Sequence, residues 1–228
     1  MIKFLSNLFE NLHILQNIYI KNNFFFKKKS YSMDQEDLII KEYFKEKNKG
    51  FYVDVGCYHP LQRNNTMLLY QKGWRGINID ISYFSIKLFK FLRPDDFNLN
   101  TAVSNKEGDV NMFYQKKLSQ LSTIKENQAQ NAFQGNILKK KISSKRLTSI
   151  LDESHYKNQK IDFLNIDVEG ADFEVLQSLD FNKYSPELIC IEVIEKNLEN
   201  SDVFNFLHKN RYKKIWSGVF SHIFQKIN

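Results

Sequence analysis

One stretch of the chain changes from a strand-like pattern to a helical pattern within a few residues. Ile161 to Ile166 is an apolar run, and apolar residues recur at helical spacing from Phe173 to Leu179. Asp167, Glu169 and Gly170 separate the two patterns. A buried strand that ends in carboxylates and turns over a glycine into a helix is typical of an open α/β sheet. Ligands of such sheets sit just outside the carboxyl ends of the strands.

A second stretch of the same kind lies upstream. Phe51 to Val55 is predicted to be a buried strand, with Gly56 opening the turn that follows it. Helical spacing from Asn64 to Gln71 comes next, and Gly76 to Ile81 forms another apolar strand pattern. Repetition of strand, turn and helix favours a parallel sheet.

The remaining pattern completes an α/β fold with a doubly wound, mostly parallel sheet and a C-terminal antiparallel hairpin. We expect one Rossmann-like domain over residues 32–228, with residues 115–147 forming a long loop over the mouth of the site. Further expected elements are helices at Asp37–Phe44 (begun by Ser32 or Asp34 and ended by Gly50), Tyr83–Phe91 and Val203–Lys209, and strands at Phe97–Val103, Asp109–Tyr114, Leu188–Ile194, Tyr212–Trp216 and Phe220–Lys226.

Residues 1–31 are expected to form a basic and apolar helical extension. Its apolar stretch is too short and too interrupted by polar residues to span a bilayer. We expect a helix packed on the domain or on another subunit. The alternative is an amphipathic helix at a membrane surface, with the lysines Lys27 to Lys29 meeting lipid phosphates. The helical spacing is carried by Leu5, Leu8, Leu12, Leu15 and Ile18.

Composition adds little to the functional prediction. The 228-residue chain has 33 basic and 26 acidic residues, a net charge of +7, and no nucleic-acid-binding motif accompanies its lysine clusters at 27–29 and 139–141. A soluble, basic, cytoplasmic protein, or one peripheral to the membrane, is therefore expected. Cys57 and Cys190 lack a CxxC partner and are expected to be reduced core residues.

The turn after Val55 is the expected cofactor site. Asp80 ends the next strand about 25 residues after Asp54, where an acid can accept the hydroxyl hydrogens of an adenosine ribose. The loop GCYHPLQRNN lacks the glycines that a pyrophosphate needs, which disfavours NAD and FAD. Acids at strand ends, Asp54 and Asp167, suit the sulfonium cation of S-adenosylmethionine better.

The segments FYVDVGCYHP, NNT, KGWRGINIDIS, TAVSNKEGDVNMFY, RLTSIL and IDFLNIDVEGADFEVLQSLDF together resemble the FkbM-type S-adenosylmethionine-dependent methyltransferases. The resemblance implies a class I methyltransferase fold and methyl transfer to oxygen, commonly a hydroxyl of a sugar or glycan precursor. It places Asp54, Gly56 and Tyr58 on the methionine part with Asn65 and Thr66 nearby, Asp80 on the ribose, Ala102 and Val103 near the adenine, and Asp167 and Glu169 at the reaction centre.

The chain departs from this family at three places, of which VDVGC in place of the family's VDVGA is a small change. The family often has glutamate and proline where Asp80 and Ile81 stand, so a shorter side chain would reach the ribose less directly. Residues 116–145 match no strong family feature, and acceptor specificity is expected to lie there.

Several acidic residues and one histidine are candidates for catalysis. Asp167 is expected near the sulfonium and the acceptor, or as a helix cap. Glu169 is a candidate base or acceptor ligand, or a partner of the helix dipole. His59 is a candidate base in a loop facing the cofactor, or a loop-packing residue. A divalent metal held by Asp167, Glu169 and Glu192 is an alternative that no ligand spacing demands.

Two other functions fit parts of the sequence. An NAD-dependent oxidoreductase would use the same strand–turn–helix unit but lacks its glycine pattern. A non-catalytic basic protein that docks on membranes or RNA would use the lysine clusters. This function does not explain the acids at the ends of three strands.

Overall fold

The computed structural model describes residues 2–26, 28–194 and 197–227. A seven-stranded sheet with the order β3-β2-β1-β7-β8-β10-β9 forms its centre. The five strands from β3 to β8 are parallel, and β10 is antiparallel to both β8 and β9, which confirms the mostly parallel sheet and the C-terminal hairpin. These strands are β1 (Phe51–Val55), β2 (Arg75–Asp80), β3 (Phe97–Asn100), β7 (Phe163–Ile166), β8 (Leu188–Glu192), β9 (Tyr212–Ser217) and β10 (Ser221–Lys226).

Strands β1 and β7 are the point where the strand order reverses. The chain moves from β1 to β2 and β3 on one side, and β7 and β8 extend the sheet on the other. Val55 pairs with Ile166, so both strands end at the same edge of the sheet. This edge is where a doubly wound sheet opens a crevice for a ligand.

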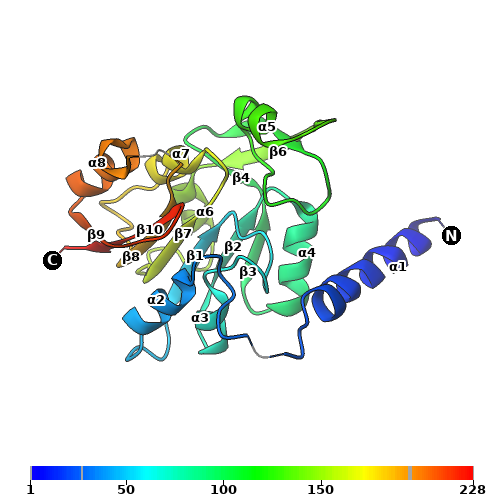
Figure 1. The fold of residues 1–228 in the computed structure, drawn as a ribbon, viewed down its shortest axis with the longest axis horizontal. Helices are drawn as coiled ribbons and strands as arrows, with labels where there is room; N and C mark the ends of the chain where they lie inside the picture. Colours follow the sequence, from blue (N-terminus) through cyan, green and yellow to red (C-terminus); the bar gives the residue numbers. More distant parts are fainter. Residues whose placement is uncertain (1, 27, 195–196, 228) are drawn as a thin grey trace.

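Helices cover both faces of the sheet (Figure 1). Alternating side chains explain this arrangement: Val53 and Val55 point into one apolar cluster, while Tyr52 points into the other with Trp74. The first face carries α6 (Leu147–Glu153), α7 (Asp172–Gln177) and α8 (Asp202–Lys209), and the second carries α2 (Glu36–Tyr43) and α3 (Met67–Gln71). Helix α4 (Tyr83–Leu92), capped by Ser82, contacts β2 and β3.

The middle of the chain differs most from expectation. The strand expected over Phe97–Val103 divides at Thr101, whose hydroxyl donates to the Ser143 carbonyl at 2.8 Å. Residues 115–147 are not a plain loop but include a helix and a strand. The second sheet has the order β4-β6-β5; β5 (Gly108–Tyr114) confirms the strand expected at Asp109–Tyr114, whereas α5 (Glu126–Ala132) and β6 (Leu138–Lys145) were not expected, and β4 (Ala102–Val103) is the detached end of the divided strand.

The start of α2 also differs from the sequence prediction. The N-cap position is Gln35 and neither Ser32 nor Asp34, although the Ser32 hydroxyl accepts from the Asp37 amide at 3.3 Å and donates to the Asp37 carboxylate at 2.8 Å. The helix ends at Tyr43, well before Gly50. The polar residues before the helix therefore fold back on its first turn instead of preceding it as a cap.

The N-terminal extension begins with α1 (Ile2–Leu15) and continues as a π-helix (Gln16–Lys21). Ile14 and Ile18 are buried against Phe84 and Leu88 of α4, so this part of the extension packs on the domain. Figure 1 shows the rest of α1 projecting beyond α4. In the described part of the chain, no helix combines the length and the apolar character needed to cross a bilayer.

A buried polar network holds the switch point. Asp54 has 1% of its surface exposed and accepts hydrogen bonds from Thr66 (2.8 Å), Asn165 (2.9 Å) and Asn64 (3.2 Å). The fully buried Arg93 guanidinium donates to Asn64 at 2.7 Å and to Thr66 at 2.8 Å. An anion and a cation thus share two polar side chains, which links β1, β7, α4 and the loop before α3.

We expect Asp54→Ala to lower the free energy of unfolding by about 3–5 kcal/mol, because it leaves the buried Arg93 charge and three donors uncompensated. Urea denaturation measures this change. The control is Asp95→Ala, which breaks an exposed ion pair with Arg75 (3.3 Å) and should cost less than about 1 kcal/mol. Equal effects of the two substitutions would contradict the structural role of Asp54.

Candidate active site

A cavity with a volume of about 310 Å³ lies at the carboxyl edge of the sheet. Four neighbouring strands each contribute a residue at or just after their ends. These are Gly56 after β1, Asp80 of β2, Asp167 after β7 and Glu192 of β8. The structure thus brings together, in one cavity, residues that lie far apart in the sequence.

Gly56 is required by a close approach of two backbones. Its φ is +79°, and its amide donates to the Ile79 carbonyl at 2.9 Å. A Cβ at this position would lie 1.6 Å from the Asp167 carbonyl oxygen. Only glycine fits here, and its absent side chain lets the two strand ends lie side by side.

The Asp80 carboxylate organises the turns beside Gly56. Its two oxygens accept backbone hydrogen bonds from Tyr58 (2.8 Å) and Ser82 (2.6 Å). Burial raises the pKa of Asp80 to about 6. Each carboxylate oxygen has a second lone-pair direction, so Asp80 can still accept hydrogen bonds from ligand hydroxyls in the cavity.

Three carboxylates gather at the ends of β7 and β8. One oxygen from each of Asp167, Glu169 and Glu192 lies within 4.8 Å of the others. Burial, followed by the negative charge of neighbouring acids, raises the pKa of Asp167 well above its ordinary value, that of Glu169 to about 7, and that of Glu192 to about 10. Such a cluster titrates as a unit and retains protons at neutral pH unless a cation compensates its charge.

Two kinds of cation suit this cluster. Oxygen ligands at this spacing are those that Mg²⁺ prefers. An organic cation would gain the same Coulomb attraction without being coordinated. Oε2 of Glu192 is buried and has no hydrogen-bond partner among the described residues, so the protein leaves this oxygen open to a ligand.

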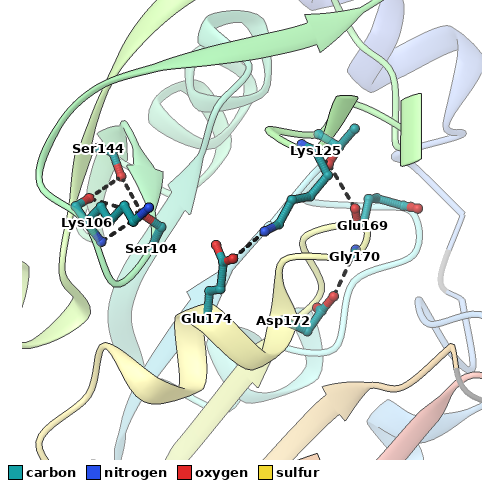
Figure 2. A network of polar contacts seen from close by, with 9 residues as sticks. Ser104, Lys106, Lys125, Ser144, Glu169, Gly170, Asp172 and Glu174 are labelled. Carbon is teal, nitrogen blue, oxygen red and sulfur yellow. Dashed lines mark hydrogen bonds and ion pairs between the residues drawn. The ribbon is translucent and has the colours of Figure 1, made fainter. Parts of the chain in front are cut away.

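The turn that presents Glu169 is held from both sides. Glu169 and Gly170 have positive φ, +57° and +90°, and the Asp172 carboxylate accepts from the Gly170 amide at 3.0 Å and from the Val168 amide at 2.9 Å. Figure 2 shows this contact beside the ion pair between Lys125 and Glu174. Thus Asp172, rather than Asp167, holds the start of α7, and Asp167 remains free to face the cavity.

Residues before and within α5 form the opposite wall. Thr123 donates to the Glu169 carbonyl at 2.9 Å, which ties this wall to the acidic cluster. The wall includes Ser119, Gln120, Leu121, Ser122, Ile124 and Gln128. Part of the expected loop over residues 115–147 therefore lines the cavity, between residues 119 and 128, and the region is partly helical.

Not all the expected cofactor residues line the cavity. Tyr58, Asn65, Ala102 and Val103 do, and Asn65 donates to the Asn165 side chain at 2.9 Å. Asp54 and Thr66 lie behind the wall in the buried network described above. Asp54 and Thr66 therefore do not contact a ligand in the cavity; they hold the turn that shapes the cavity.

The loop after β1 does line the cavity through Tyr58 and Arg63, but His59 is not a base there: it is the loop-packing residue that the sequence offered as the alternative. His59 is fully buried outside the cavity, where its Nε2 lies 2.9 Å from the Asn17 oxygen and its Nδ1 accepts from the Leu61 amide at 3.0 Å. Burial lowers its pKa to about 3. His59 is neutral and fastens the extension to the domain through Asn17 and Asn22, which lies 3.2 Å from its Nε2.

Two charged residues of the cavity were not identified from the sequence. Glu36, in the first turn of α2, is buried and accepts from the Asp34 amide at 2.8 Å, and Arg63 has a φ of +49° in the loop after β1. No local pattern distinguishes Glu36 from other acids at helix starts. Cys57 behaves as expected: it is a buried free thiol whose pKa is raised well above its ordinary value by burial, unsuited to nucleophilic chemistry.

Comparison with known proteins agrees with this geometry. The model of the FkbM methyltransferase domain matches residues 54–214, which include Gly56, Asp80, Asp167 and Glu192. No curated protein and no solved structure matches the chain. Because the match covers more than two thirds of the sequence and contains the whole carboxyl edge of the parallel strands, the chain belongs to the FkbM methyltransferase family.

Proposed function

We propose that this protein is an S-adenosylmethionine-dependent O-methyltransferase that acts on a hydroxyl of a sugar or glycan precursor. One observation carries the proposal: acids from the ends of β2, β7 and β8 open into a single cavity beside a glycine turn, within a domain of a methyltransferase family. The acids suit a positively charged methyl donor.

The residues present fit this donor. Gly56, Tyr58 and Asn65 would hold its methionine part, and Asp80 would accept hydrogen bonds from the ribose hydroxyls. Ala102 and Val103 supply an apolar surface for the adenine. A dinucleotide fits less well, because its pyrophosphate would lie among carboxylates without a glycine-rich loop to bind it.

S-adenosylmethionine supplies a methyl group that its sulfonium centre has already activated. The chain must then align an acceptor oxygen and accept its proton. Alignment alone can lower a barrier by about 7–11 kcal/mol. Glu169 is suited to receive the proton, since its pKa of about 7 allows it to be ionised and basic at neutral pH. Asp167 and Glu192 would stabilise positive charge beside it.

The opposite wall supports a carbohydrate acceptor. Ser119, Gln120, Ser122 and Gln128 present hydroxyl and amide groups to the cavity. Such groups both donate and accept hydrogen bonds, which matches the hydroxyls of a sugar.

Calorimetry with S-adenosylhomocysteine and NAD tests the cofactor. We expect only S-adenosylhomocysteine to bind, and Asp80→Ala to weaken it by about tenfold to a hundredfold through the loss of charge-assisted hydrogen bonds. Asp109→Ala, an exposed acid outside the cavity, is the matched control and should leave the dissociation constant unchanged. Binding of NAD without S-adenosylhomocysteine would overturn the proposal.

Asp167→Asn should reduce methyl transfer from labelled S-adenosylmethionine to sugar acceptors by about 10²-fold or more, because it removes negative charge at the reaction centre. Its melting temperature without ligand should stay the same or rise, since a like-charge repulsion disappears. Wild-type turnover in this variant would exclude Asp167 from the reaction.

The preference for the cationic donor should increase with pH. Glu169 is mostly protonated at pH 6 and mostly ionised at pH 8, since its pKa is raised to about 7. The ratio of the dissociation constants of S-adenosylhomocysteine and S-adenosylmethionine should therefore rise by about tenfold across this range. Glu169→Gln should flatten the rise, and an equally steep profile in that variant would assign it to another group.

A further inference from the structure

We propose that the N-terminal extension is a docking surface for an anionic lipid bilayer. The docking surface consists of exposed apolar side chains of α1, the π-helix and the segment that follows. Phe9 is 66% exposed, Ile20 69%, Phe25 78% and Phe26 72%. Its other members are Leu8, Leu12, Leu15 and Phe24, with Phe91 of α4.

The domain cannot cover this surface, because α1 contacts the domain through its opposite side. His13 stacks on Phe84 with 4.5 Å between ring centroids, and Glu10 pairs with Lys87 at 3.6 Å. Ile14 is buried on the same side. At 100° per residue, Leu8, Leu12 and Leu15 lie on the far side of the helix. Of the apolar stripe seen in the sequence, Leu8, Leu12 and Leu15 are therefore uncovered, whereas Ile18 is buried against the domain.

The exposed side chains form one continuous area. Tyr19 joins its parts: its ring centroid lies 5.2 Å from that of Phe24, 5.3 Å from Phe25 and 6.1 Å from Phe91. A shallow hollow lined by Phe9, Leu12, Leu15, Tyr19 and Ile20 adjoins this cluster. Clustered aromatic side chains of this kind favour the boundary between lipid headgroups and acyl chains.

The charge around the docking surface selects an anionic bilayer. Lys21, Lys29 and Lys90 are exposed, and in the sequence Lys21 follows Ile20, Lys29 comes three residues after Phe26, and Lys90 precedes Phe91. Residues 1–31 contain Lys3, Lys21 and Lys27 to Lys29 but only one acid, Glu10, which Lys87 already neutralises. Lysines at the rim of an apolar surface gain energy from anionic headgroups. A second copy of the chain would instead bring like charges together.

Vesicle flotation of the full chain tests the proposal. We expect binding to phosphatidylcholine vesicles with about 30% phosphatidylglycerol, little binding to pure phosphatidylcholine, and weaker binding when salt rises from about 0.1 M to 0.5 M. Phe25→Ser with Phe26→Ser should reduce the bound fraction at least about tenfold, because both side chains are exposed and would leave the bilayer.

Two matched pairs of variants localise the binding. Ile20→Ser should weaken it, whereas Val219→Ser, equally 69% exposed but in the C-terminal hairpin, should not. Lys21→Glu with Lys29→Glu should abolish binding, whereas Lys139→Glu with Lys141→Glu makes the same charge change on exposed β6 and should leave binding intact. Equal losses within either pair would overturn the assignment to this surface.

Two further results would also overturn the proposal. One is the absence of binding to anionic vesicles. The other is a dimer in sedimentation velocity that Phe25→Ser with Phe26→Ser converts to monomer without any effect on vesicles, which would make a second copy the occupant. Calorimetry with S-adenosylhomocysteine on the same variants keeps the two proposals separate, because we expect its affinity to be unchanged whether or not the vesicles bind.

Discussion

The contact between Gly56 and the Asp167 carbonyl sets the geometry of the whole carboxyl edge. With 1.6 Å between a hypothetical Cβ and that oxygen, no other residue could follow β1 without pushing β7 away. The parallel pairing of β1 with β7, and of β7 with β8, then fixes Asp167 next to Glu192. A backbone contact therefore determines where the acidic side chains meet, and the buried Asp54 network behind it keeps the strands in register.

This arrangement concentrates negative charge where it is costly. Raised pKa values of Asp167, Glu169 and Glu192 mean that the folded state resists their ionisation, so this cluster opposes folding increasingly as the pH rises. Apolar packing of the sheet must offset that cost. A bound cation would remove this cost. The free energy released when the repulsion is relieved contributes to the affinity for the cation, and cation binding stabilises the folded state by the same linkage. Acidic groups with pKa values perturbed in this way cluster at functional sites.

Local sequence patterns predicted the strands that are buried on both faces of the sheet. Strands β1, β2, β7 and β8 are buried on both sides, so their apolar runs mark them, and the acids and Gly56 at their ends stand out. Strand β6 is exposed over its first half, where lysines hide its alternation. His59 was misjudged because its burial depends on Asn17 and Asn22, which come from a different part of the chain. Contacts at such sequence separation leave no periodic signal.

The net charge of +7 does not describe the local charge of either the cavity or the docking surface. The cavity is acidic, whereas the N-terminal extension that carries the apolar docking surface is basic. At physiological salt, charges separated by more than about 8 Å are largely screened from each other, so each surface acts on the ligand in contact with it. A cation can therefore be held in the cavity of a protein that is attracted as a whole to anions. Separation of the two charge types is what lets one small domain combine an acidic site with a basic, apolar extension.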